Sequence, residues 1–155
     1  MLVLHLFLAL AWLAITGELT PGNFLAGFTL AYLLLWVMRH ILGCQTYVRR
    51  VWDTAGLVLY VIWEVILSGL RVAYDVITPR HHMRPGILAV PLAAENDMEI
   101  FILASLVTLT PGTLSLDVSS DRKTLYVHEM YISDPDEARR KIKEGIERRL
   151  LKVLR

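Results

Sequence analysis

Residues 54–77 read TAGLVLYVIWEVILSGLRVAYDVI, an apolar stretch whose only charged residues are Glu64, Arg71 and Asp75. At about 100° per residue, the polar side chains of a helix through this stretch fall close to one line. They are Asp53, Tyr60, Glu64, Ser68, Arg71, Asp75 and Thr78. A narrow polar stripe therefore runs along an otherwise apolar helix. Because an ionised side chain facing lipid tails costs several kcal/mol, we expect the stripe to face protein or lipid headgroups.

The sequence on either side of this stretch divides into two halves of different character. Residues 1–78 hold four Arg, four acidic residues and no Lys, whereas residues 79–155 hold twelve Lys or Arg and eleven Asp or Glu. The chain has 155 residues, 55% of them hydrophobic, and its mean hydropathy of +0.48 is high for a soluble domain. These numbers predict a membrane domain over 1–78 and a water-facing domain over 79–155.

Composition and motifs exclude several classes of function. A net charge of +1 lacks the basic surplus of a general nucleic-acid binder, and the single Cys44 excludes a disulfide framework or a cysteine zinc site. His81 and His82 are adjacent, so they point in different directions, and they lack further ligands at metal-binding spacing. No glycine-rich phosphate loop or nucleophile motif is present. We expect no enzyme activity, no cofactor, no metal site and no small-molecule substrate bound by this chain alone.

The N-terminal half predicts a helical hairpin, with helices at about 1–16 and 23–42 joined by a Pro-Gly turn. Gly27 and Ala31 lie four residues apart and give the second helix a small-residue face for a close neighbour. His5 is expected to be hydrogen-bonded at a helix interface. The connection at 39–53 carries three Arg whereas the turn at 17–22 carries none, so the positive-inside bias places the former in the cytoplasm.

The third hydrophobic segment, 54–77, has two interpretations. If this helix crosses the bilayer, the charged C-terminal half lies opposite the Arg-bearing connection, which conflicts with the orientation bias. If it lies at the cytoplasmic surface, both basic regions share one side, although its polar arc is thin and poor in Lys and Arg. We favour two crossings and a third, amphipathic, membrane-associated helix. Glu64, Ser68, Arg71 and Asp75, together with Gly27, are the candidate subunit interface.

The C-terminal half predicts a small cytoplasmic α+β domain of order β-α-β-β-α. A short strand near 87–92 is apolar on both faces, and Pro91 restricts it to an edge or an end. A helix capped by Asn96 or Asp97 follows, and then a hairpin whose first strand alternates Leu114, Leu116 and Val118 with polar residues facing water. The last helix begins at Asp134-Pro135, and its many basic residues suit headgroups, solvent or an acidic partner.

The turn Pro111-Gly112-Thr113 is a candidate structural motif between the helix and the hairpin. Glycine takes the positive φ that a helix C-terminus often needs, whereas other residues take it only with strain. We therefore expect Gly112 to have a positive φ.

Taken together, these segments resemble the E subunit of the Mrp-type (also Mnh or Pha) multisubunit monovalent cation/proton antiporter. The likeness covers nearly the whole chain and is most specific in the hairpin of the C-terminal half. The matching segments are Thr20-Pro21-Gly22-Asn23-Phe24-Leu25-Ala26-Gly27, Trp63-Glu64 with Ser68, Arg84-Pro85-Gly86, Leu109-Thr110-Pro111-Gly112-Thr113-Leu114-Ser115-Leu116-Asp117 and Leu125-Tyr126-Val127-His128.

The resemblance implies a non-catalytic, multi-pass subunit of a Na+(K+)/H+ antiporter in a prokaryotic cytoplasmic membrane. Larger subunits of such a complex carry the ion-translocating Lys and Glu residues, and this chain has no Lys in its first 122 residues. Its expected partners are other subunits and the lipid bilayer, and its expected work is assembly and stability of the complex. The alternative is a free-standing, membrane-anchored regulatory or adaptor domain.

Overall fold

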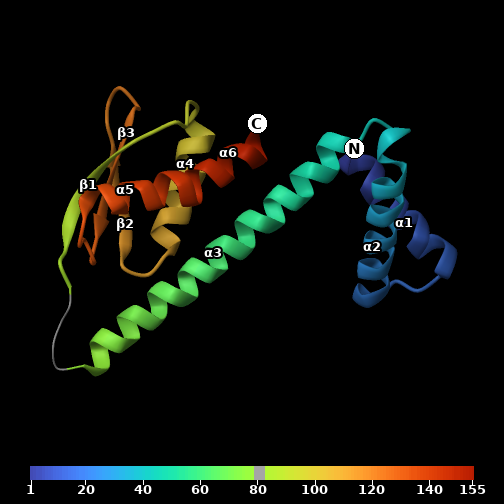
Figure 1. Cartoon of the computed structure of the whole chain (residues 1–155). Coiled ribbons are helices and arrows are strands. Elements are labelled where there is room, and N and C mark those ends of the chain that lie inside the picture. The colour runs from blue at the N-terminus through green and yellow to red at the C-terminus, as the bar shows by residue number, and fades with distance from the viewer. Residues whose placement is uncertain (79–82) are drawn as a thin grey trace. The chain divides into compact units, whose positions relative to one another are not determined.

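A computed structural model describes residues 1–78 and 83–155 and divides the chain into two compact units, Met1–Trp52 and Asp53–Arg155 (Figure 1). His81 and His82 lie outside the described residues. The sequence placed the domain boundary at 78/79, whereas the compact units divide at 52/53. The reason is that residues of the third helix share a hydrophobic core with the α+β domain.

The N-terminal unit contains α1 (Leu2–Thr16), α2 (Pro21–Val37), the 3-10 turn η1 (Met38–His40) and the first turns of α3 (Gln45–Ile77). Helix α2 begins two residues earlier than expected, because Pro21 fits the first helical turn and the Thr20 side chain accepts a hydrogen bond from the Asn23 N–H at 3.2 Å. Helix α3 begins at Gln45, nine residues before the expected start, so Arg49 and Arg50 are helical. Pro21–His40 and Gln45–Ile77 are long and apolar enough to cross a membrane, whereas Leu2–Thr16 is shorter.

His5 joins the elements of the N-terminal unit. Its Nε2–H donates to the Phe28 carbonyl at 2.8 Å, and its Nδ1 accepts from the Tyr47 hydroxyl at 2.6 Å. The imidazole also stacks on the Phe28 ring, with centroids 4.0 Å apart. His5 is buried, and both ring nitrogens have partners. The expectation of a hydrogen-bonded histidine at a helix interface is confirmed.

Two further contacts close the α1–α2 hairpin. The Trp12 indole N–H donates to Asn23 Oδ1 at 2.9 Å, and the Asn23 amide donates to Thr16 Oγ1 at 2.6 Å and to the Glu18 carbonyl at 2.8 Å. The Trp12 side chain lies directly against Gly27, where an added Cβ would be 2.7 Å from Trp12 Cδ1. The small-residue face of α2 is therefore occupied by α1 of the same chain.

The α+β domain has the expected order β-α-β-β-α. It comprises β1 (Gly86–Pro91), α4 (Asp97–Leu109), β2 (Thr113–Val118), β3 (Thr124–Glu129) and a C-terminal helix made of α5 (Pro135–Arg140), η2 (Lys141–Glu147) and α6 (Arg148–Leu154). The antiparallel sheet has the strand order β1-β3-β2, so Pro91 ends an edge strand as expected. The side chains of Asn96 and Asp134 cap α4 and α5, accepting from the N–H groups of Glu99 and Asp136.

The prediction of which residues are buried is wrong for two strands, β1 and β2. Leu114 and Leu116 are about half exposed, whereas the Ser115 hydroxyl donates to the Ala104 carbonyl of α4 at 2.9 Å, so Ser115 faces the helix. In β1 the buried residues are Leu88 and Val90, and Ile87 on the other face is exposed. The domain therefore buries one face of its sheet only.

The turn between α4 and β2 is held by hydroxyl groups. Thr113 Oγ1 donates to the Val107 carbonyl at 2.6 Å, and its backbone N–H donates to the Thr110 carbonyl at 3.2 Å. Gly112 has a φ of 89°, which confirms the expected positive value. Its carbonyl accepts from the Met130 N–H at 2.9 Å, so the turn is also tied to the end of β3.

Two buried carboxylates hold the loop between β1 and α4. Glu147 Oε1 accepts from the Ala93 N–H at 2.6 Å and from the Ala94 N–H at 3.1 Å. Glu99 accepts from the Glu95 N–H at 2.9 Å and pairs with the Arg155 guanidinium at 3.0 Å. Hydrogen bonds from Arg155 and from the Glu95 N–H lower the pKa of Glu99 from 4.5 to about 2, although burial opposes them.

We expect Glu99→Gln to lower the unfolding free energy of the domain by about 1–3 kcal/mol at pH 7, because a charge-assisted interaction is lost. The folded pKa lies below the unfolded value, so this contribution is complete above about pH 4.5 and declines as the pH falls toward 2. Thermal unfolding of both proteins between pH 2 and pH 7 measures the difference. Glu95→Gln is the control, because Glu95 is 81% exposed and lies 3.6 Å from Arg155. A constant difference across this range would contradict the assignment.

Candidate functional site

The polar stripe of α3 faces the α+β domain within the same compact unit. Leu57 and Val61 belong to the domain's buried core, and Tyr60 and Val65 pack against it. One side of α3 therefore completes the hydrophobic core of the small domain, which explains why its polar groups need not face lipid.

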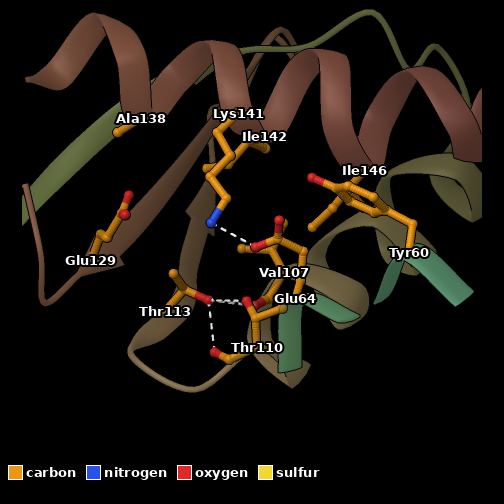
Figure 2. Close-up of a pocket in the computed structure, with 10 residues that line it drawn as sticks. All are labelled: Tyr60, Glu64, Val107, Thr110, Thr113, Glu129, Ala138, Lys141, Ile142 and Ile146. Carbon is orange, nitrogen blue, oxygen red and sulfur yellow. Dashed lines mark hydrogen bonds and ion pairs between the residues drawn. The ribbon is translucent and has the colours of Figure 1, made fainter. Parts of the chain in front are cut away.

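Glu64 forms an ion pair with Lys141 at the centre of this contact. Glu64 Oε2 lies 2.6 Å from Lys141 Nζ, and the Glu64 side chain is 12% exposed whereas that of Lys141 is 51% exposed. Figure 2 shows the two side chains meeting across a pocket between α3 and the C-terminal helix. The cavity measures about 40 Å³, and Thr110, Thr113 and Glu129 are among its lining residues.

Further charges continue the contact toward the C-terminal end of α3. The Arg71 guanidinium lies over the Tyr131 ring, 5.6 Å from its centroid, and Asp75 is buried. Burial raises the pKa of Glu129, whereas the nearby cations Lys141 and Arg71 lower it. We call Glu64, Arg71, Glu129 and Lys141 the charged junction. It contains two acids and two bases, so its formal charge balances.

Next to the charged junction, the Tyr60 side chain closely approaches the backbone of the C-terminal helix. A Cβ at Gly145 would overlap the Tyr60 hydroxyl, so the Tyr60 side chain lies directly against the backbone of the C-terminal helix. Gly145 belongs to η2, which is π-helical, and the Arg149 guanidinium lies 4.1 Å from the centroid of the Tyr60 ring. Helical periodicity did not predict this π-helical segment or its contact with Tyr60. The glycine within an amphipathic helix was the available signal.

The structure gives the predicted interface residues partners or neighbours inside the chain. The Ser68 hydroxyl donates to the Glu64 carbonyl and to the Val65 carbonyl at 3.4 Å, both in its own helix. Glu64, Arg71 and Asp75 lie along the contact with the α+β domain, whereas Gly27 packs against Trp12 in the other unit. Within the chain, Lys141 supplies an ion-pair partner for Glu64. An interface role for these residues stays a prediction.

The geometry of the charged junction suits fixed charge pairing. Among residues 1–78 and 83–155, no three His, Cys, Asp or Glu side chains gather as a metal site would require. Five basic residues of the C-terminal helix and end have acceptors in the same unit: Arg139, Lys141, Lys143, Arg149 and Arg155. Fold and site define a chain with two helices long and apolar enough to cross a membrane, and with ionisable groups that pair within its own elements.

Comparison with known proteins shows the family to which this chain belongs. The family model described as MNHE, Na+/H+ ion antiporter subunit, matches residues 5–153. The E subunit of a Na+/H+ antiporter from Alkalihalophilus pseudofirmus is 36% identical, over 98% of this chain and 96% of that one. The corresponding antiporter protein of Bacillus subtilis is 34% identical, over 99% and 98%. The chain therefore belongs to the family of Na+/H+ antiporter subunits.

Two solved structures have similar chains. One comes from the Mrp complex of Dietzia sp. DQ12-45-1b, with a TM-score of 0.52 and 29% identity over 66% of this chain and 96% of that one. The other belongs to the membrane-bound sulfane sulfur reductase, an archaeal respiratory membrane complex. It has a TM-score of 0.56 and 26% identity over 96% and 95%. Chains similar to this one thus occur in two differently named complexes.

Proposed function

We propose that this chain is a non-catalytic structural subunit of a multisubunit Na+(K+)/H+ antiporter, and that it supports assembly and stability of the complex. The relatives named as antiporter subunits support this role. A similar chain in a reductase supports it further, because a component shared by complexes of different chemistry suits a structural task common to both. Its partners are the other subunits and the lipid bilayer.

The Glu64–Lys141 ion pair is the observation that carries the proposal. Glu64 is the carboxylate in the most apolar part of the chain, where a proton carrier would be sought. A carrier must change its protonation during each cycle, whereas Glu64 is held 2.6 Å from a cation on the opposing helix of its own unit. The pair joins two elements of one fold, which is a structural use of charge.

Cation/proton exchange by Glu64→Gln complexes tests the proposal. The amide keeps the shape of the side chain but cannot carry the proton of a carboxyl group. We expect exchange per assembled complex, measured in membrane vesicles and normalised to the largest subunits, to stay within about twofold of the unsubstituted complex. Ser105→Ala is the control for an exposed site outside the junction. A fully assembled Glu64→Gln complex without exchange would overturn the structural role, and so would isolation of the chain without other subunits.

We further propose that α1 and α2 cross the membrane and that the α+β domain lies in the cytoplasm. The three Arg between α2 and residue 53, and the basic C-terminal helix, support this orientation. Cys44 is buried and does not suit thiol labelling, so the probe is Thr46→Cys, an exposed site, in a Cys44→Ala background. An impermeant maleimide should label this cysteine in inverted vesicles and not in intact cells. Labelling of intact cells would reverse the orientation.

A further inference from the structure

Between residues 54 and 77, the face of α3 turned away from the α+β domain is largely apolar. Between residues 54 and 77 its exposed side carries no charged residue except Arg71, whose guanidinium turns back over the Tyr131 ring. Residues at helical spacing form a continuous exposed stripe that includes Leu59, Ile62, Trp63, Ile66, Leu70 and Ile77. Leu59, Trp63 and Leu70 are each about 60% exposed or more. An exposed apolar stripe of this length marks a site that binds another protein or a membrane.

The opposite face of the same helix cannot lie in lipid. Its contacts with the α+β domain extend from Leu57 in the core to Arg71 at the Tyr131 ring. At 1.5 Å per residue this is roughly 21 Å, most of the hydrocarbon thickness of a bilayer. A helix crossing in this conformation would carry Lys141, Glu129 and Arg149 into the hydrocarbon, at a cost of several kcal/mol for each charge.

We propose that residues 54–77 of α3 lie in the plane of the membrane surface, with the apolar stripe in the acyl-chain boundary and the α+β domain on the aqueous side. The occupant of the stripe is an anionic lipid bilayer. This inference deepens the proposed function and rests on its membrane location. It assigns α3 the role of a surface helix, although its length and hydropathy alone would suit a crossing.

Charge and aromatic composition favour lipid as the occupant. Arg49 is exposed near the start of α3 and suits anionic headgroups. Trp52, Trp63 and Tyr74 are exposed along the helix, and such amphipathic rings concentrate at the boundary between headgroups and acyl chains. The exposed side of the helix thus carries the aromatic residues that are typical of an interfacial helix.

Depth measurements on nitroxide side chains distinguish the surface helix from a crossing helix. Single cysteines replace Leu59, Ile66, Leu70 or Ile77 in a Cys44→Ala background, with Lys152→Cys as an exposed aqueous control. The purified complex is reconstituted into phosphatidylethanolamine–phosphatidylglycerol vesicles. Accessibility to oxygen and to a water-soluble nickel chelate gives the depth of each label. We expect the four labels on α3 to share one shallow depth, with high access to oxygen.

Two other outcomes of the depth measurement would overturn the proposal. A steady change of depth, up to roughly 27 Å between residues 59 and 77, would show a crossing helix and overturn the proposal. Labels closed to both oxygen and the chelate would show a protein partner on the stripe and overturn lipid as its occupant. Either result leaves the subunit role intact, whereas failure of the chain to purify with other subunits would remove the proposed function itself.

Discussion

Replacing Lys141 by Met is expected to destabilise the contact between α3 and the α+β domain more than replacing Glu64 by Gln. The asymmetry follows from burial, since the Glu64 side chain is 12% exposed and that of Lys141 is 51% exposed. Lys141→Met leaves a nearly buried carboxylate without its cation, whereas Glu64→Gln leaves an ammonium group that water can reach. We expect losses of about 2 kcal/mol and about 1 kcal/mol of unfolding free energy, respectively.

The double variant Glu64→Gln with Lys141→Met completes a mutant cycle. Its loss should be smaller than the sum of the two single losses, because neither partner is then left ionised and unpaired. Thermal unfolding of the purified protein in detergent, followed by circular dichroism, supplies the values. Lys152→Met is a matched control, because Lys152 is an exposed lysine on the same helix. Strict additivity would show that the pair does not couple α3 to the domain. Equal losses in both single variants would contradict the asymmetry expected from burial.

Local hydrogen bonding explains which parts of this fold the sequence could predict. The start of α5 depends on Asp134 and Pro135, and that of α4 on Asn96, all within a few residues of the groups they affect. The positive φ of Gly112 and the edge position of Pro91 follow from the backbone chemistry of single residues. The predictions of these features were correct because short-range interactions determine them.

Features that depend on distant residues were either not predicted or predicted wrongly. Leu114 and Leu116 alternate as a buried face would, yet Ser115 faces α4, where its hydroxyl donates to the Ala104 carbonyl. Lys141, the partner of Glu64, lies far from it in the sequence, in the C-terminal helix. Helical periodicity gives no information about such a distant partner. Periodicity defined the polar stripe of α3 correctly, but the group facing the stripe depends on tertiary packing.

Replacing Gly27 by Leu is expected to open the α1–α2 hairpin. An added Cβ would lie 2.7 Å from Trp12 Cδ1 and 2.9 Å from Trp12 Cγ, so the bulky ring or the helix must move. Movement of α1 would also disturb the hydrogen bonds of Trp12 to Asn23 and of His5 to Phe28. Overpacking of this kind costs about 2 kcal/mol or more, and the yield of folded chain in membranes should fall several-fold. Gly22→Leu is the control, because nothing lies within 4 Å of a Cβ there.

A second substitution separates intramolecular packing from a subunit interface at Gly27. Trp12→Ala removes the ring that the new side chain would strike, so Gly27→Leu combined with Trp12→Ala should recover part of the lost folded chain if the contact is within the hairpin. Quantitative blotting of the chain and of the co-isolated subunits measures both effects. If Gly27 instead meets another subunit, the double variant should still lose its partners although the chain itself is abundant. That result would assign the small-residue face of α2 to the complex, because only a contact outside the chain would remain sensitive to the Gly27→Leu substitution once the Trp12 ring is absent.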